Sequence, residues 1–553
     1  MNIISGQSAC GGIAFGKLAI KQKNTSLIKR RHIKNAEEEI KRFDTARAET
    51  DKQLGILYNK ALSEVGEENA MIFEIHKMML EDEDYLNSIH NIIKSQMLNA
   101  EAAVAATADN FAEMFTAMDD SYMQARASDV RDVSERIISV LAGNSNLNGK
   151  LTNPVIIAAD DLVPSETVQL DKEKILAFVT ENGSRNSHTS ILARTLNIPA
   201  ITQANGITNP DFDGADVIVD GFNGKVYINP DEKTRSQMLK LKEEADKHIK
   251  LLNTYKEKEP VTKDGKNIKL YANIGNTDDL ALVYKNGAQG VGLFRSEFVY
   301  LERKNFPTED EQFRIYKSVV EKMAGKTVII RTLDIGADKQ VDYFNMPHEE
   351  NPAMGIRAIR ICLKNPKIFK TQLRALYRAS VYGNMSIMFP MITSLDEVIE
   401  IKKICTDVQN ELKAEKIPYS ENVELGIMIE TPAAALICDK LAGLVSFFSV
   451  GTNDLTQYTM AADRQNSEAE KYCTGHHTAI LRMIKYIADC AHKSGIWAGI
   501  CGELGSNIDL IPFFLAAGID ELSVSPGKIL EVKKTIIETD VSKIKNEQLK
   551  RIE

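Results

Sequence analysis

Charged and polar residues follow four apolar, strand-like runs in the second half of the chain. The four segments are GLFRSE (292–297), IIRTLDIG (329–336), IMIETP (427–432) and SVGTNDL (449–455). Parallel strands of a barrel place the residues at their carboxyl ends on one face, so we expect Arg295, Arg331, Glu430 and Asp454 to converge. Arginine binds phosphate and carboxylate oxygens bidentately, whereas Mg²⁺ takes one or two protein carboxylates. This combination predicts phosphoryl chemistry on an anion held with a divalent cation.

A second segment, NGSRNSHTSILARTLNIPA (182–200), places His188 in a loop between a strand-like run and an expected helix. Free backbone N–H groups at a helix start favour phosphate oxygens, and an imidazole there can become a phosphorylated nucleophile. A single histidine at such a position also serves as a capping or packing residue. From this segment alone both interpretations stay open.

Composition limits the classes of protein that fit. The chain has 553 residues, a net charge of -9 and a charged fraction of 26%. This chain is too long for a single hydrophobic core, so its length predicts about three domains.

We expect a cytoplasmic protein, because the chain has no apolar run of about 18 residues and no secretory signal pattern. Its seven cysteines are scattered without a C-x-x-C pair, which argues against a disulfide framework or a zinc site. The acidic balance disfavours sequence-independent nucleic-acid binding.

The chain divides into stretches of different periodicity. Residues 34–141 contain no proline and only two glycines, which predicts a helical block. Short strand-like runs precede it at 11–20 and follow it between 153 and 230, so we expect the block to be inserted into one α/β domain. Residues 231–258 are charged, with apolar positions on one helical face, and predict a linker helix. From 268 onward eight strand-like runs alternate with helical segments, which fits a (β/α)8 barrel better than an open doubly wound sheet.

The motifs that carry these residues resemble one family. Besides the loop around His188, they are LFRSEF, RTLDIGADK, NPAMGIRAIRI, GIMIETP, GTNDLTQYT, ADR and CGE in the second half, and FEIHKMMLEDED and ASDVRD in the helical block. The chain is similar, in register over nearly its whole length, to the Enzyme I family of the bacterial sugar phosphotransferase system. The resemblance implies a multidomain α/β protein: a swivelling phosphohistidine α/β domain with an inserted all-helical domain, followed by a C-terminal (β/α)8 TIM-type barrel.

The resemblance also implies domain bounds and partners. Residues 1–21 and 144–230 would form the phosphohistidine domain, 22–143 the helical domain that binds the phosphocarrier HPr, 231–260 the linker helix, and 261–553 the barrel. The barrel would bind phosphoenolpyruvate with Mg²⁺ and form a homodimer. The implied reaction transfers the phosphoryl group of phosphoenolpyruvate to His188 and then to a histidine of HPr, releasing pyruvate. From the net charge and the lack of a long apolar run we expect no nucleic-acid partner and no membrane insertion.

Carried over residue by residue, the resemblance assigns roles to the predicted site. His188 would accept the phosphoryl group, and Cys501 would be the acid that protonates the enolate of pyruvate. Glu430 and Asp454 would bind the metal. The substrate would be bound by Arg295, Arg331, Asn453, Asp454 and Arg464.

Several positions depart from the family pattern. Ser184 and Ala337 stand where glycine is usual, and Gly505 and Asn507 stand where alanine and aspartate are usual. None of these changes removes a proposed ligand or nucleophile. Two alternatives are a dikinase and a catalytically weakened paralogue acting as a regulatory phosphorelay scaffold. The first needs a phosphate-cradling glycine loop, which residues 34–141 lack. The retained arginines, carboxylates and Cys501 argue against the second.

Overall fold

The computed structural model resolves into two compact units, Met1–His248 and Ile249–Glu553. It describes residues 1–21, 29–65, 67–116, 121–143, 153–162, 174–183, 189–190, 193, 198–277, 279–301, 303, 305–336, 341–346, 348–463, 466 and 469–553. His188, Arg464, Ser184 and Ala337 lie outside these residues. Among the described helices, none is both long and apolar enough to cross a membrane.

The first unit contains a mixed sheet whose strand order, within the described residues, is β1-β8-β7-β3-β4-β5-β6-β2. As the sequence predicts, the N-terminal run becomes a sheet strand, because β3 pairs with β4 in parallel and with β7 in antiparallel register. Buried aliphatic side chains of several of these strands pack together into a hydrophobic core. The strands are β1 Asn2–Ser5, β2 Gln7–Cys10, β3 Ile13–Lys21, β4 Val155–Ala159, β5 Ile175–Thr180, β6 Ala200–Thr202, β7 Asp216–Asp220 and β8 Lys225–Ile228.

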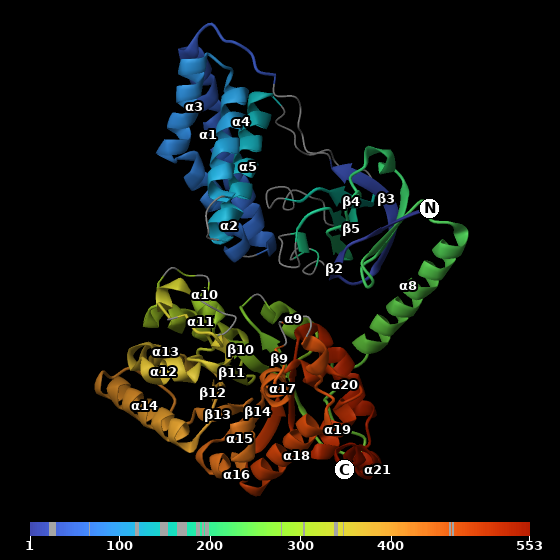
Figure 1. The fold of residues 1–553 in the computed structure, drawn as a ribbon, viewed down its shortest axis with the longest axis vertical. Helices are drawn as coiled ribbons and strands as arrows, with labels where there is room; N and C mark the ends of the chain where they lie inside the picture. The colour runs from blue at the N-terminus through green and yellow to red at the C-terminus, as the bar shows by residue number, and fades with distance from the viewer. Residues whose placement is uncertain are drawn as a thin grey trace. The chain divides into compact units, whose positions relative to one another are not determined.

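The predicted helical block is present between β3 and β4 in the chain. Its helices run side by side around an apolar core that includes the fully buried Phe43, Phe73 and Ile89 (Figure 1). Asp82 accepts a hydrogen bond from the Tyr85 N–H and so caps the third helix. The helices are α1 Ala36–Val65, α2 Glu67–Leu80, α3 Glu83–Gln96, α4 Ala100–Thr116 and α5 Ser121–Leu141.

Helix α8, Glu232–Asn253, corresponds to the predicted linker helix. Its Met238 is buried in a small apolar cluster with Ile13 and Ile218 of the sheet. Most of its other side chains are exposed, which agrees with the charged character of the segment. The helix therefore packs on the sheet through few residues. It ends at Asn253, five residues after the end of the first unit at His248.

The second unit contains the predicted barrel. Eight parallel strands close on themselves in the order β9 to β16, and all eight strand-like runs of the sequence contribute one strand each. The strands are β9 Lys269–Ile274, β10 Val291–Arg295, β11 Val328–Arg331, β12 Met385–Phe389, β13 Glu424–Ile429, β14 Phe447–Val450, β15 Trp497–Ile500 and β16 Glu521–Val524. Because neighbouring strands are parallel, all their carboxyl ends lie on one face of the barrel.

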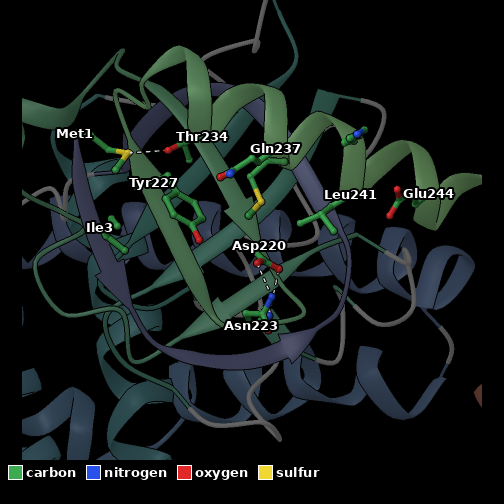
Figure 2. Close-up of a pocket in the computed structure, with 11 residues that line it drawn as sticks. Met1, Ile3, Asp220, Asn223, Tyr227, Thr234, Gln237, Leu241 and Glu244 are labelled. Atoms are coloured by element: carbon green, nitrogen blue, oxygen red, sulfur yellow. Dashed lines mark hydrogen bonds between the residues drawn. The ribbon is translucent and has the colours of Figure 1, made fainter.

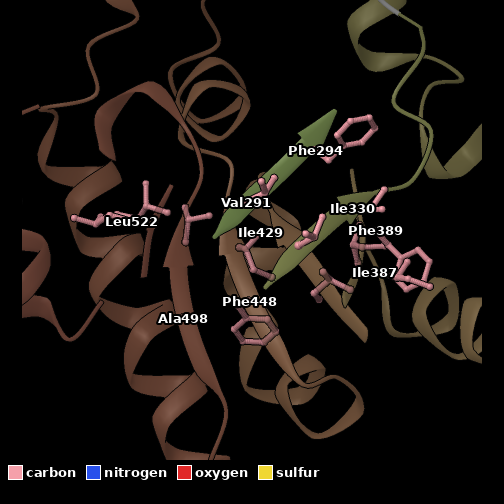
Figure 3. Close-up of a cluster of buried hydrophobic side chains, with 14 of the residues drawn as sticks. Val291, Phe294, Ile330, Ile387, Phe389, Ile429, Phe448, Ala498 and Leu522 are labelled. Atoms are coloured by element: carbon pink, nitrogen blue, oxygen red, sulfur yellow. The ribbon is translucent and has the colours of Figure 1, made fainter. Parts of the chain in front are cut away.

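Side chains alternate along the barrel strands. Ile330, Ile429 and Phe448 belong to the large core that the strands share with the surrounding helices (Figure 3). Residues one position away, Ile329 and Met428, belong to a separate cluster in the barrel interior. The principal helices of this unit are α9 Asp279–Lys285, α10 Phe298–Leu301, α11 Glu309–Lys322, α12 Ile359–Lys364, α13 Pro366–Ala379, α14 Leu395–Ala414, α15 Pro432–Leu436, α16 Cys438–Leu441, α17 Thr452–Met460, α18 Thr478–Lys493, α19 Ile511–Ala517, α20 Ile529–Glu538 and α21 Val541–Leu549.

Helix α11 begins with a reciprocal cap that offers a test of the barrel's local stability. The Glu311 N–H donates to the Thr308 hydroxyl at 3.3 Å, and the Thr308 N–H donates to the Glu311 carboxylate at 2.8 Å. Loss of such a cap costs about 1 kcal/mol. We expect Thr308→Ala to lower the free energy of unfolding of the barrel by about this amount. Trp497 is the sole tryptophan and lies in β15, so its fluorescence during urea denaturation reports the barrel alone.

Thr308→Ser retains the hydroxyl and is the matched control. We expect it to unfold at nearly the wild-type urea concentration. Equal destabilisation by both substitutions would contradict the capping explanation.

Candidate active site

Four predicted site residues lie at the carboxyl-terminal face of the barrel. Arg295 is the last residue of β10 and Arg331 the last of β11. Glu430 directly follows β13, and Asp454 lies in the first turn of α17, just after β14. Arg331, Glu430 and Asp454 are buried, whereas Arg295 is exposed. The strand ends therefore bring charged groups from separate parts of the chain to one rim.

Arg331 is held between two carboxylates. Its Nη2 lies 2.6 Å from Glu297 Oε1, and its Nη1 lies 2.8 Å from Asp334 Oδ2. Burial acts to lower the pKa of Arg331, but Asp334, Glu297 and Glu430 raise that pKa well above its ordinary value. The guanidinium therefore stays charged although its side chain is only 6% exposed. A buried, fixed positive charge is suited to binding an anion.

The structure adds an arginine that the strand-end analysis missed. Arg357 Nη2 lies 3.2 Å from Asp334 Oδ1, and Arg357 Nη1 lies 3.5 Å from Asp454 Oδ1. Arg357 Nη1 also donates to the Tyr458 hydroxyl at 3.1 Å. Asp334 consequently bridges the two buried guanidinium groups of Arg331 and Arg357. Arg357 lies in the NPAMGIR segment, just before α12 and many residues from any strand end, so the strand pattern does not predict its place at the rim.

Glu430 carries an unpaired oxygen. Its Oε1 accepts a hydrogen bond from the Met391 N–H at 2.7 Å, but its buried Oε2 has no hydrogen-bond partner within the described residues. Burial raises the pKa of Glu430 to about 8, and Asp454 and Asp334 add to that rise. A Cβ atom at Gly451 would lie 2.5 Å from Oε2, so glycine there leaves space beside this oxygen.

Glu430 and Asp454 together fit a hard divalent cation. Among the described residues, no group of three or more histidine, cysteine, aspartate or glutamate side chains could hold a metal ion. A pair of carboxylates suits Mg²⁺, which keeps several of its positions for water and substrate oxygens. The unpaired Glu430 Oε2 is the observation that agrees best with a cation at this place.

Cys501 follows β15 and is buried. Its thiol donates a hydrogen bond to the Val450 carbonyl, with 3.6 Å between sulfur and oxygen. Burial raises the pKa of Cys501 to about 12; Ser449 opposes this shift and Glu430 reinforces it. The side chain is therefore a protonated thiol at neutral pH and can donate a proton.

Asn453 and two departures from the family pattern lie near Cys501. Asn453 Oδ1 accepts a hydrogen bond from the Glu503 N–H at 3.1 Å, which ties the first turn of α17 to the segment after β15. Gly505 is buried close to Ile500, and the Asn507 side chain contacts His476. Among the described residues, these contacts of Gly505 and Asn507 involve none of the predicted site residues.

A groove in the first unit contains none of the predicted site residues. It lies between α8 and the sheet, has a volume of about 510 Å³, and is lined by residues such as Ile3, Tyr227 and Leu241 (Figure 2). Its buried carboxylate, Asp220, accepts hydrogen bonds from two backbone N–H groups and from the Asn223 side chain. The buried carboxylate of the groove is therefore fully occupied by local hydrogen bonds, unlike the Glu430 carboxylate of the barrel face.

Comparisons with known proteins agree with a division of the chain into several domains. Family models match residues 5–126 (PEP-utilising enzyme, N-terminal), 151–224 (PEP-utilising enzyme, mobile domain) and 250–541 (PEP-utilising enzyme, PEP-binding domain). The phosphoenolpyruvate-protein phosphotransferase of Listeria monocytogenes is 42% identical over 98% of this chain and 95% of its own length. The protein of that name from Bacillus subtilis is 42% identical over 99% of this chain and 95% of its own length. This chain belongs to the phosphoenolpyruvate-protein phosphotransferase family.

The family membership agrees with the resemblance that the motifs carry. A solution structure of an Enzyme I protein is 38% identical, covers 44% of this chain and 99% of its own, and has a TM-score of 0.38. In this family member, the barrel face combines Arg331, Arg357, Glu430, Asp454 and Cys501 within one buried polar region.

The Asp334 bridge yields a stability prediction. Replacement by asparagine would leave Arg331 and Arg357 buried without their shared carboxylate, and breaking a buried ion pair costs about 3 kcal/mol or more. We expect Asp334→Asn to lower the free energy of unfolding of the barrel by this amount, measured by Trp497 fluorescence. Asp509→Asn, at an exposed position, is the control and should change it by less than about 0.5 kcal/mol. Equal effects of the two substitutions would contradict the bridging role.

Proposed function

We propose that this chain transfers the phosphoryl group of phosphoenolpyruvate to its own His188 and then to a histidine of HPr, releasing pyruvate. This is the first step of the sugar phosphotransferase system. The observation that carries the proposal is the buried Arg331–Asp334–Arg357 network beside the unpaired oxygen of Glu430. Fixed arginines and a pair of carboxylates suit a substrate that carries both a phosphate and a carboxylate and binds with a metal ion.

Each part of the site has a place in this reaction. Arg295, Arg331 and Arg464, with Arg357, bind and orient the substrate anion, and Asn453 and Asp454 contribute further contacts. Glu430 and Asp454 would hold Mg²⁺, which would supply charge neutralisation for the phosphate and the developing enolate. The Cys501 thiol donates its proton to C3 of the enolate, which gives the methyl group of pyruvate. Phosphoryl transfer needs positioning and charge neutralisation more than covalent help, and this barrel face is equipped for both.

The domains take the roles that the sequence implies. Residues 1–21 and 144–230 carry His188 and swivel, residues 231–260 link them to the barrel at 261–553, and the barrel also forms the homodimer. Residues 22–143 dock HPr, through a surface that includes the acidic run at the start of α3. Glu81, Glu83 and Asp84 are exposed in that run, which supports recognition of a basic partner, whereas Asp82 is engaged as a helix cap.

A weakened scaffold is the less supported alternative. Such a paralogue would be expected to lose charged groups whose burial is costly and which serve only catalysis. Arg331, Glu430, Asp454 and Cys501 are instead all buried in mutually consistent positions. This retention favours an active enzyme.

The first test of the proposal concerns His188. We expect His188→Ala to abolish labelling of the protein by ³²P-phosphoenolpyruvate with Mg²⁺ and without ATP, because the acceptor nitrogen is gone. Binding of phosphoenolpyruvate, measured by calorimetry, should change little, because the substrate site lies on the barrel. His248→Ala, an exposed histidine on α8, is the control and should label as wild type. Persistent labelling of His188→Ala would refute the assignment of the acceptor.

The second test concerns the metal. We expect Glu430→Gln and Asp454→Asn each to reduce Mg²⁺-dependent turnover by about 100-fold, because amides are poorer ligands for a hard cation. Titration with Mn²⁺, followed by electron paramagnetic resonance, should show weakened metal binding in both variants. Glu400→Gln, exposed on α14, should bind the metal normally. Full wild-type activity in excess chelator would contradict the metal role.

A further inference from the structure

The barrel interior holds a carboxyl group that the proposed reaction does not use. Glu521, the first residue of β16, is 1% exposed, and the Ser523 hydroxyl donates a hydrogen bond to its Oε1. Burial raises the pKa of Glu521 to about 8, although Ser523 and Lys269 oppose this rise. A neutral carboxylic acid is therefore present inside the barrel at neutral pH. With Oε1 accepting from Ser523, Oε2 is left to carry the proton.

Glycines on the neighbouring strands make room for this carboxyl group. A Cβ atom at Gly499 of β15 would lie 2.1 Å from Glu521 Oε2, and one at Gly292 of β10 would lie 2.7 Å from Oε1. Gly499 pairs in register with Glu521 on one side and with Ser449 of β14 on the other. The carboxyl group thus lies over the bare backbone of Gly499, whose other strand neighbour is Ser449.

Ser449 stands between Glu521 and Cys501 in the strand register, because it pairs with Gly499 on the side opposite Glu521. Its hydroxyl is buried. A side-chain interaction with this hydroxyl lowers the pKa of the Cys501 thiol, against the larger rise that burial causes. Cys501 stands two residues after Gly499, hence on the same inward face. The Glu521 carboxyl, the Ser449 hydroxyl and the Cys501 thiol consequently surround one glycine.

We propose that Glu521 returns a proton to Cys501 through the Ser449 hydroxyl after each turnover. The inference rests on the proposed function, in which the S–H bond of Cys501 breaks as the C–H bond of pyruvate forms. The resulting thiolate takes the hydroxyl proton of Ser449, and Ser449 takes the proton of Glu521 Oε2. One S–H bond forms, one carboxyl O–H bond breaks, and the Ser449 O–H bond is exchanged. Water then reprotonates Glu521, which acts through Cys501 and contacts no substrate atom.

The groups around Glu521 define the pH dependence. Lys269 and Tyr271 face it from β9, Cys501 from β15 and Ser523 from its own strand, while β10 and β15 present glycines beside it. The folded pKa of Glu521 is about 8, above its ordinary value, so the acid form predominates below that pH. Proton supply is therefore present at neutral pH and is lost as the pH rises through about 8.

The experiment compares pyruvate chemistry in the full-length protein and three variants. Exchange of the pyruvate methyl protons with D2O, in the presence of Mg²⁺, measures proton transfer at Cys501 by NMR. We expect Glu521→Gln and Ser449→Ala each to slow this exchange by about tenfold, with unchanged affinity for phosphoenolpyruvate. Glu424→Gln, an exposed carboxylate at the start of β13, is the control and should exchange as wild type.

The pH profile distinguishes a role of Glu521 in proton supply from a role in packing alone. Wild-type turnover of phosphoenolpyruvate should fall as the pH rises through about 8, and Glu521→Gln should lack this decline. Ser449→Ala removes a single small hydroxyl, so it tests the relay even if Glu521→Gln does not fold. Wild-type exchange in Ser449→Ala would overturn the inference. A wild-type protein that neither exchanges pyruvate protons nor accepts label would instead overturn the proposed function.

Discussion

The charge balance around Asp334 is the constraint on which the barrel face depends. Two guanidinium groups are buried there, and neither could remain without a carboxylate to compensate it. Asp334 serves both Arg331 and Arg357, so the positions of the two arginines are coupled through one side chain. Because Asp454 also contacts Arg357, the same network continues to one of the proposed metal ligands. Anion binding and cation binding therefore share one electrostatic framework.

The same electrostatic framework also raises the pKa of Glu430. Its carboxyl group lies among other carboxylates in a buried environment, and its pKa is raised to about 8. A proton and a divalent cation are thus alternative ways to compensate the same negative charge. This arrangement explains why an unpaired carboxylate oxygen is tolerated inside the protein, where an isolated charge would be strongly destabilising. It also makes the site dependent on the small residue at Gly451, which leaves space beside that oxygen.

The sequence could predict the barrel and its rim because both follow from local pattern. Eight apolar runs gave the eight strands, and a polar residue at a parallel strand end must lie on the same face as the others. Arg357 could not be found in this way, because it comes from an irregular segment that only tertiary packing brings to the rim. The short strands β1 and β2 were missed for a similar reason: each is four residues long and exists through pairing with a distant strand. The roles assigned to His188 and Arg464 rest on sequence resemblance, since both lie outside the described residues.

The barrel interior combines apolar and polar groups, and this combination connects the fold to the reaction. The inward positions include Leu293, Ile329 and Met428, which form one apolar cluster with Tyr271 of β9 and Phe447 of β14. On β14 to β16 and β9 the inward groups include hydroxyl, carboxyl and amide groups. Asn273 of β9 donates to the carbonyls of both Cys501 and Ser523, which holds these strand ends together. Apolar surroundings strengthen the electrostatic interactions of the charged groups that are buried with them. Polar groups beneath Cys501 can exchange protons with the thiol from inside the barrel, so substrate binding at the open face need not interrupt that exchange.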